Sequence, residues 1–123
     1  MKKKWKPSGV GQPQTFYLNW FGQIVMDAFG EPPYLVGSAT RGKIWRDVDV
    51  RLILDDKEWK KYGFGDPENP GAKWASFCMA FAALGKHITG LPVDFQIQQM
   101  THANKLFSRK TGCIRSALLW IYK

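Results

Sequence analysis

Residues 34–56 read YLVGSATRGKIWRDVDVRLILDD. The first three residues of this stretch form an apolar run that predicts a short strand, and Gly37-Ser38 ends it. A short basic stretch follows, with exposed amide groups expected near Ser38. Residues 46–54 then alternate between polar and apolar side chains, which predicts a second strand. The sequence therefore predicts two strands joined by a Gly-Ser turn and a short connection.

The second of these strands carries two acids. Side chains alternate between the two faces of a strand, so Asp47 and Asp49 are expected on one face, about 6–7 Å apart. A third acid, Asp94, lies in residues 91–98, which predict a further strand, and it also lies opposite that strand's apolar face. If the two strands are neighbours with matching faces, three carboxylates meet on one side of the sheet.

Residues suited to binding phosphate precede the paired acids. Gly37 lets the backbone approach a phosphate with no Cβ in the way, and Ser38 adds a hydroxyl donor. Arg41 and Lys43 contribute positive charge close by in the sequence. Mg²⁺ prefers carboxylate and phosphate oxygens, and two such ions can hold the reacting groups of a phosphoryl transfer. These residues predict a site for two Mg²⁺ ions, or Mn²⁺ in their place, and a nucleoside triphosphate.

The order Gly-Ser, eight residues, Asp-Val-Asp-Val and a later acid on a strand resembles the nucleotidyltransferase superfamily typified by DNA polymerase β. In size the chain is most similar to the minimal nucleotidyltransferases. The resemblance implies an α/β (α+β) fold, with a small mixed β-sheet of the nucleotidyltransferase type and helices packed on one face. It also implies that Gly37 and Ser38 contact the triphosphate. Asp47 and Asp49 would bind both metal ions, and Asp94 the catalytic one.

The reaction implied by this resemblance transfers a nucleoside monophosphate from an NTP to a hydroxyl acceptor and releases pyrophosphate. Larger members of the superfamily add a helical domain that grips the base and the acceptor, whereas only a short segment follows Asp94 here. Three explanations remain open: a small acceptor, a partner subunit that completes the site, or a minimal acceptor-binding surface. The sequence does not identify the acceptor, and a nucleic acid, a protein and a small molecule all stay open.

Composition and charge allow a second interpretation. The 45% hydrophobic and 15% aromatic residues indicate one folded domain over 15–123, and the lysine-rich residues 1–14 predict a flexible basic arm. A net charge of +8 indicates an anionic partner. The alternative function is a non-catalytic, basic nucleic-acid-binding module or a pseudoenzyme with the same fold. The role of the basic group at Arg109, Lys110 and Arg115 stays open.

The sequence also bears on the compartment and on partners. No segment approaches the roughly 20 apolar residues of a membrane span, so no membrane association is expected. Cys78 and Cys113 lack the spacing of a zinc site or a disulfide framework, which favours a cytoplasmic protein. The aromatic content is compatible with a homodimer or a partner subunit.

The remaining segments are predicted from periodicity and from helix-ending residues. Apolar residues at helical spacing predict a helix over 15–30, and a second that begins at Asn69-Pro70 and ends at Gly85 or Gly90. Residues 55–71, which begin with two acids expected to form a turn, are predicted to be a long connection and a candidate lid. A short helix is expected over 99–107. The apolar residues 117–122 are compatible with either a strand or a helix.

Overall fold

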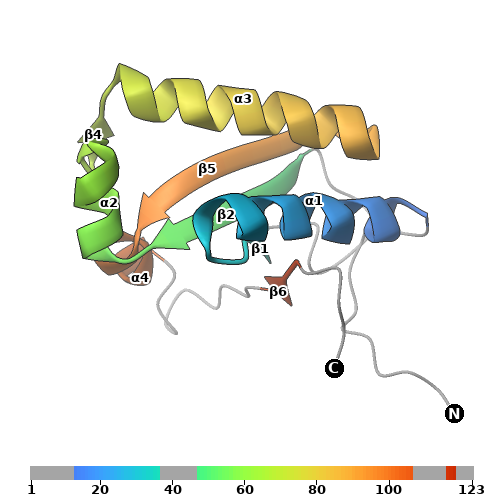
Figure 1. Ribbon diagram of the computed structural model, residues 1–123, viewed down its shortest axis with the longest axis horizontal. Coiled ribbons are helices and arrows are strands. Elements are labelled where there is room, and N and C mark those ends of the chain that lie inside the picture. Colours follow the sequence, from blue (N-terminus) through green and yellow to red (C-terminus); the bar gives the residue numbers. More distant parts are fainter. Residues whose placement is uncertain (1–12, 37–46, 107–115, 119–123) are drawn as a thin grey trace, which may run out of the picture.

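The computed structural model describes residues 13–36, 47–106 and 116–118, and Figure 1 shows how their elements are arranged. In chain order, these elements are α1 (Gln14–Phe29), β1 (Tyr34–Val36), β2 (Val48–Leu54), α2 (Asp56–Tyr62), β3 (Gly65–Asp66), β4 (Asn69–Pro70), α3 (Ala72–Thr89), β5 (Val93–Gln99), α4 (Met100–Leu106) and β6 (Ser116–Ala117). None of the helices in these ranges is long and apolar enough to cross a membrane.

The main sheet is small and mixed. Its strand order is β5-β2-β1-β6, with β2 parallel to β5 and β1 antiparallel to both β2 and β6. A parallel pair requires a long crossover, and here the chain makes it through α2, the β3–β4 hairpin and α3. The expected mixed α+β class is thereby confirmed.

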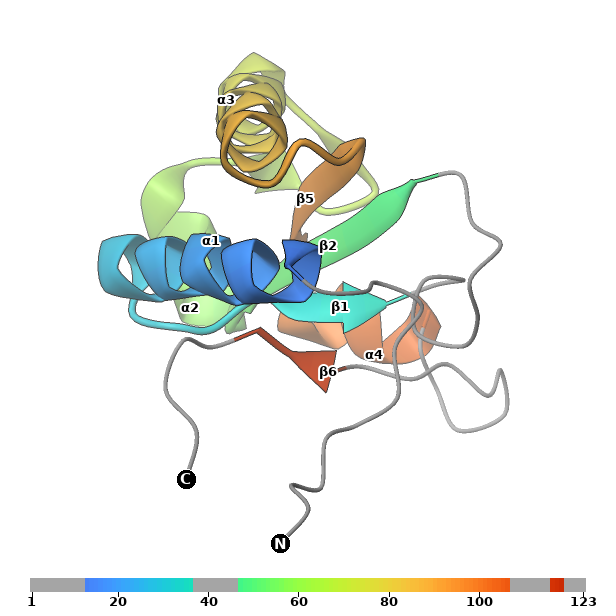
Figure 2. The same cartoon turned by 90° about the vertical axis from the view of Figure 1, so that its right-hand side faces the viewer.

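Helices α1 and α3 pack on the apolar face of β2 and β5. The parallel register places Val50 beside Phe95 on that face. Phe95 meets Phe21 of α1 at a ring-centroid distance of 5.9 Å and Phe81 of α3 at 5.5 Å. Figure 2 shows α1 beside β1 and β2, and α3 beside β5. Phe21 and Phe81, two aromatic residues at helical spacing, therefore pack against the core strand, whereas Tyr17 of α1 is exposed.

The other helices are placed differently. Both α2 and α4 lie at the carboxyl ends of β2 and β5 (Figure 1). The two helices are linked by a hydrogen bond, which the Thr101 hydroxyl of α4 donates to the Asp56 carboxylate of α2 at 2.6 Å. The expectation that the helices share one face of the sheet thus describes α1 and α3 only.

The expectation of a long connection over 55–71 is wrong, because these residues form α2 and a β-hairpin. Asp55 is the N-cap of α2, and its side chain accepts a hydrogen bond from the Glu58 amide at 2.7 Å. Trp59 and Phe64 are buried, with their rings 5.2 Å apart in an edge-to-face contact. These two aromatic anchors attach the segment to the core, so it is part of the packed structure.

The predicted start of the second long helix is also wrong. Asn69 and Pro70 form β4, and Gly71 is the N-cap of α3. The helix ends at Gly90, which has a left-handed φ of 73° that favours glycine. Gly85 lies inside the helix, so of the two proposed ends the later one is correct.

The remaining predictions agree with the structure to within a few residues. Helix α1 ends at Gly30, and β5 and α4 cover the strand and the short helix predicted over 91–98 and 99–107. The last apolar segment, 117–122, begins in the two-residue strand β6, and most of it lies outside the described residues.

Candidate acid site

The parallel pairing of β2 with β5 brings Asp49 and Asp94 together. The register places them directly beside each other on the face opposite Val50 and Phe95. Neighbouring strands lie about 4.8 Å apart, so these two side chains start from adjacent backbone positions. The alternation of each strand predicts which face its acid occupies. The parallel register shows in addition that the two acids are direct cross-strand neighbours.

Asp47 is close to this pair but lies outside the strand. It is exposed and immediately precedes β2. Partial burial raises the pKa of Asp49, the Arg51 guanidinium opposes this, and the negative charges of Asp94 and Asp47 raise that pKa further. The three predicted acids therefore interact electrostatically. They do not converge, however, since no three acidic, histidine or cysteine side chains of the described ranges form a group able to hold a metal ion.

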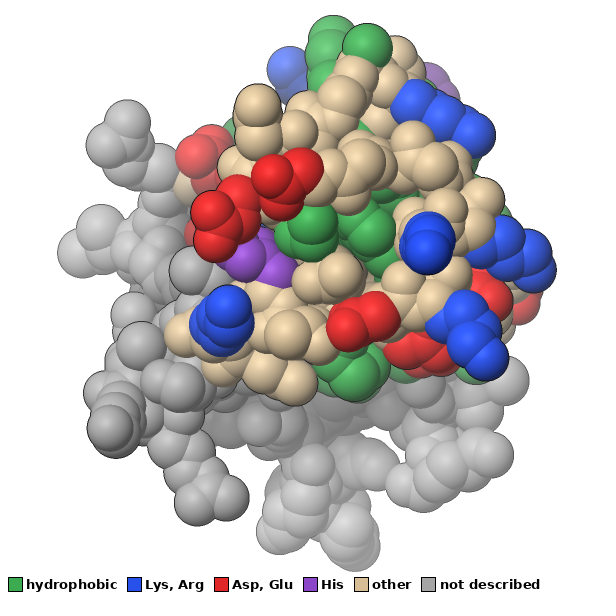
Figure 3. All heavy atoms as spheres, turned by 90° about the vertical axis from the view of Figure 1, so that its left-hand side faces the viewer, with side chains coloured by type: hydrophobic (Ala, Val, Ile, Leu, Met, Phe, Trp, Pro, Cys, Tyr) green, Lys and Arg blue, Asp and Glu red, His purple; other side chains and the backbone are tan. Residues whose placement is uncertain are grey.

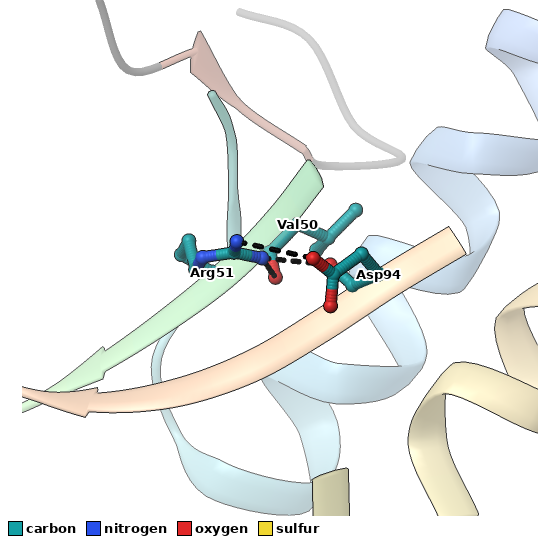
Figure 4. Close-up of polar contacts among 3 residues, drawn as sticks. All are labelled: Val50, Arg51 and Asp94. Carbon is teal, nitrogen blue, oxygen red and sulfur yellow. Dashed lines mark hydrogen bonds and ion pairs between the residues drawn. The ribbon is translucent and has the colours of Figure 1, made fainter. Parts of the chain in front are cut away.

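Arg51 links the two strands within the site (Figure 4). One of its nitrogens, Nη1, donates to the backbone oxygens of Asp94 at 2.7 Å and Val50 at 3.1 Å. The other, Nη2, lies 3.3 Å from Oδ2 of the Asp94 carboxylate. The Arg51 side chain is only 12% exposed, against 41% for Asp94. A largely buried guanidinium thus neutralises one of the two adjacent acids.

The sequence contains a signal for Arg51 that the motif alone does not use. Arg51 follows Asp49 by two positions, so strand alternation places both on one face. Its partner Asp94 is 43 positions away in the chain, and only the pairing of β2 with β5 makes the contact. Alternation therefore identifies the face of Arg51, but not the carboxylate that it binds.

The predicted phosphate-binding residues lie outside the described residues. These are Gly37, Ser38, Arg41 and Lys43. The same holds for residues 1–12 of the predicted basic arm and for the later basic group at 109–115. The acids can therefore be described in atomic terms, and the phosphate-binding half of the predicted site remains a prediction.

A pocket of about 300 Å³ lies at the opposite end of β5, between the β3–β4 hairpin and α4. Its lining includes Asp66, Glu68, His102 and Lys105, and Figure 3 shows acidic side chains next to a histidine on this face. Gln99, which also lines it, is five residues beyond Asp94 along β5, about 16 Å at 3.3 Å per residue. This pocket is therefore separate from the acid site.

The donor set at the acid site suits a hard divalent ion that shares its ligands with a substrate. Mg²⁺ typically binds proteins through one or two carboxylates, with substrate phosphates and waters as the other ligands. Asp49 and Asp94 supply two carboxylates from adjacent positions, and Asp47 a third nearby. Comparison with known proteins adds no assignment, because no family model, curated protein or solved structure matches this chain.

Proposed function

We propose that the protein is a metal-dependent nucleotidyltransferase. It would transfer a nucleoside monophosphate from an NTP to a hydroxyl acceptor and release pyrophosphate. The observation that supports this most is the register of β2 and β5, which sets Asp49 beside Asp94. Two adjacent carboxylates from neighbouring parallel strands are a suitable donor set for magnesium and a triphosphate.

The resemblance to the nucleotidyltransferases implies the roles of the acids. Asp47 and Asp49 would hold both metal ions, and Asp94 would hold the catalytic ion near the acceptor hydroxyl. In the reaction the acceptor oxygen bonds to the α-phosphorus as the bond to the pyrophosphate oxygen breaks, and the hydroxyl proton leaves. Bound metal ions would stabilise the negative charge on the phosphates. Arg51 donates a hydrogen bond to Oδ2 of Asp94. The other carboxylate oxygen, Oδ1, accepts no hydrogen bond from the described residues, so it is available for a metal ion or for the hydroxyl proton.

The distribution of charge along the chain also supports an anionic substrate. All ten acidic residues lie in the ranges 13–36 and 47–106. In the segments outside the described residues, every charged residue is basic. One of these basic segments, 37–46, leads directly into Asp47. In sequence, positive charge suited to a triphosphate therefore adjoins the acids that would hold its metal ions.

The direct test is transfer of label from each of the four α-³²P-labelled NTPs in the presence of Mg²⁺, with the protein itself, RNA and small hydroxyl compounds as acceptors. Asp49→Asn and Asp94→Asn should each reduce transfer about 10³-fold or more, since metal-bound charge stabilisation contributes several kcal/mol to such reactions. Asp27→Asn is the matched control. Asp27 is an exposed acid of α1 that accepts a hydrogen bond from Gln23 and lies outside the acid site, so transfer should be unchanged.

The basic net charge makes a nucleic-acid-binding module the competing candidate. Such a module would bind DNA or RNA with a steep dependence on salt and no need for metal. Binding that is independent of metal and unaffected by the loss of all three acids, without transfer of label from any NTP, would favour this function over the enzyme.

A further inference from the structure

Arg51 has an environment that differs from that of an ordinary surface cation. It contacts the backbone of both β2 and β5 and the carboxylate of Asp94, and its side chain is largely buried. The pair Lys61–Glu58 on α2 shows the contrast, with 4.0 Å between the charged atoms and a lysine side chain that is 74% exposed. Exposed pairs of that kind contribute little and hold no fixed geometry.

The guanidinium acts on both central acids. It contacts Asp94 directly, and it lies two positions from Asp49 on the same face of β2. The two backbone hydrogen bonds fix the guanidinium independently of the carboxylate. The sheet therefore holds the positive charge of Arg51 beside both acids. A metal ion bound to these acids would be repelled by that charge.

We propose that Arg51 is a positioning residue and the internal counter-ion of the acid site. It fixes the Asp94 carboxylate through Oδ2 and weakens the binding of free divalent metal until substrate phosphates add further ligands. This inference rests on the proposed function. It goes beyond it by assigning the coupling between metal and nucleotide binding to a residue outside the three acids.

Metal affinity without nucleotide is the quantity that tests this role. Free Mn²⁺ would be titrated by electron paramagnetic resonance against the wild type, Arg51→Gln, Arg51→Met and Arg51→Lys. A unit charge within 4–6 Å shifts an ionic equilibrium by about one to three powers of ten, so removing it should tighten Mn²⁺ binding about tenfold or more. Arg51→Lys retains the charge and should bind Mn²⁺ about as the wild type does. Lys61→Gln removes a distant, exposed charge and should leave the affinity unchanged.

The transfer rate tests the positioning part. Lysine keeps the charge but not the planar fork that bonds backbone and carboxylate together. Arg51→Lys should therefore reduce kcat about tenfold or more while its Mn²⁺ affinity stays at the wild-type level. A purely structural residue would lower the melting temperature without separating these two readouts.

The possible results distinguish this inference from the proposed function. Equal Mn²⁺ affinity in the wild type and in a folded charge-removing variant would overturn the role of Arg51 and leave the enzyme intact. Absence of Mn²⁺ binding in every folded protein, with NTP as well as without it, would remove the metal-dependent function itself. Circular dichroism identifies which variants fold, and failure of both Arg51→Gln and Arg51→Met to fold would assign Arg51 to the fold and overturn the proposal.

Discussion

The two central acids carry their charge in different surroundings. Asp94 is paired with Arg51, whereas the Asp49 carboxylate has no hydrogen-bond partner among the described residues. Burial raises the pKa of Asp49, so the folded protein holds a proton there more tightly than the unfolded chain does. Ionised Asp49 therefore opposes folding, and this penalty appears as the pH rises through the interval between the unfolded and the folded pKa.

Asp49→Asn should stabilise the protein at neutral pH, because the amide has no charge to desolvate or to be repelled. Asp49 is partly exposed, which weakens the effect, so we expect a rise in melting temperature of about 2 °C at pH 7. Below the ordinary pKa of 3.8 the wild type is protonated as well, and the difference should disappear. Thermal unfolding from pH 3 to pH 8, followed by circular dichroism, measures this difference.

Asp94→Asn is the matched variant in the same experiment. It removes the carboxylate from a largely buried guanidinium, so it should not stabilise the protein at any of these pH values. Equal stabilisation by both substitutions would mean that Arg51 does not distinguish the two acids.

At the scale of elements, the sequence predicts the faces of strands better than their partners. Alternation is local, so the side of the sheet occupied by Asp49, and likewise that of Asp94, could be read from a few neighbouring residues. The parallel pairing of β2 with β5 is not local, since it depends on the intervening crossover packing against the sheet. The sequence therefore predicts that Asp49 and Asp94 lie side by side only on the condition that their two strands are neighbours.

The segment after β2 shows the opposite case, because its helix has local signals in the sequence. Asp55 and Glu58 have the spacing of a helix start, with Lys60 and Lys61 in the last turn, as the helix dipole favours. The many polar residues and glycines of 55–71 concealed this pattern. The buried rings of Trp59 and Phe64 supply the tertiary contacts that stabilise so short a helix.

Asp55→Ala tests the cap of α2. The substitution removes the acceptor of the Glu58 amide and should lower the free energy of unfolding by about 1 kcal/mol. Asp55→Ser keeps a capping oxygen, so it should remain close to the wild type. Urea denaturation monitored by tryptophan fluorescence compares the two. A loss of equal size in both variants would show that the charge of Asp55, and not its cap, carries the effect.

At the scale of the whole molecule, small residues decide how closely α1 approaches its neighbours. Gly85 of α3 lies against the Phe21 ring, and a Cβ there would be 3.2 Å from it. Gly22 of α1 faces Leu118, whose amide donates to the Pro33 oxygen beside β1. A Cβ on Gly22 would overlap the Leu118 backbone oxygen. Helical periodicity predicts α1, but it contains no information on these contacts, which involve distant segments.

Gly22→Ala should therefore destabilise the protein even though alanine favours a helix by about 1 kcal/mol. The new methyl group meets backbone atoms, so α1 or Leu118 has to move, and we expect a net loss of about 2 kcal/mol in urea denaturation. Gly85→Ala is the graded control, because its methyl group meets side-chain atoms at 3.2 Å, and its loss should be smaller. If Gly22→Ala equals or exceeds the wild type in stability, α1 does not pack closely against Leu118.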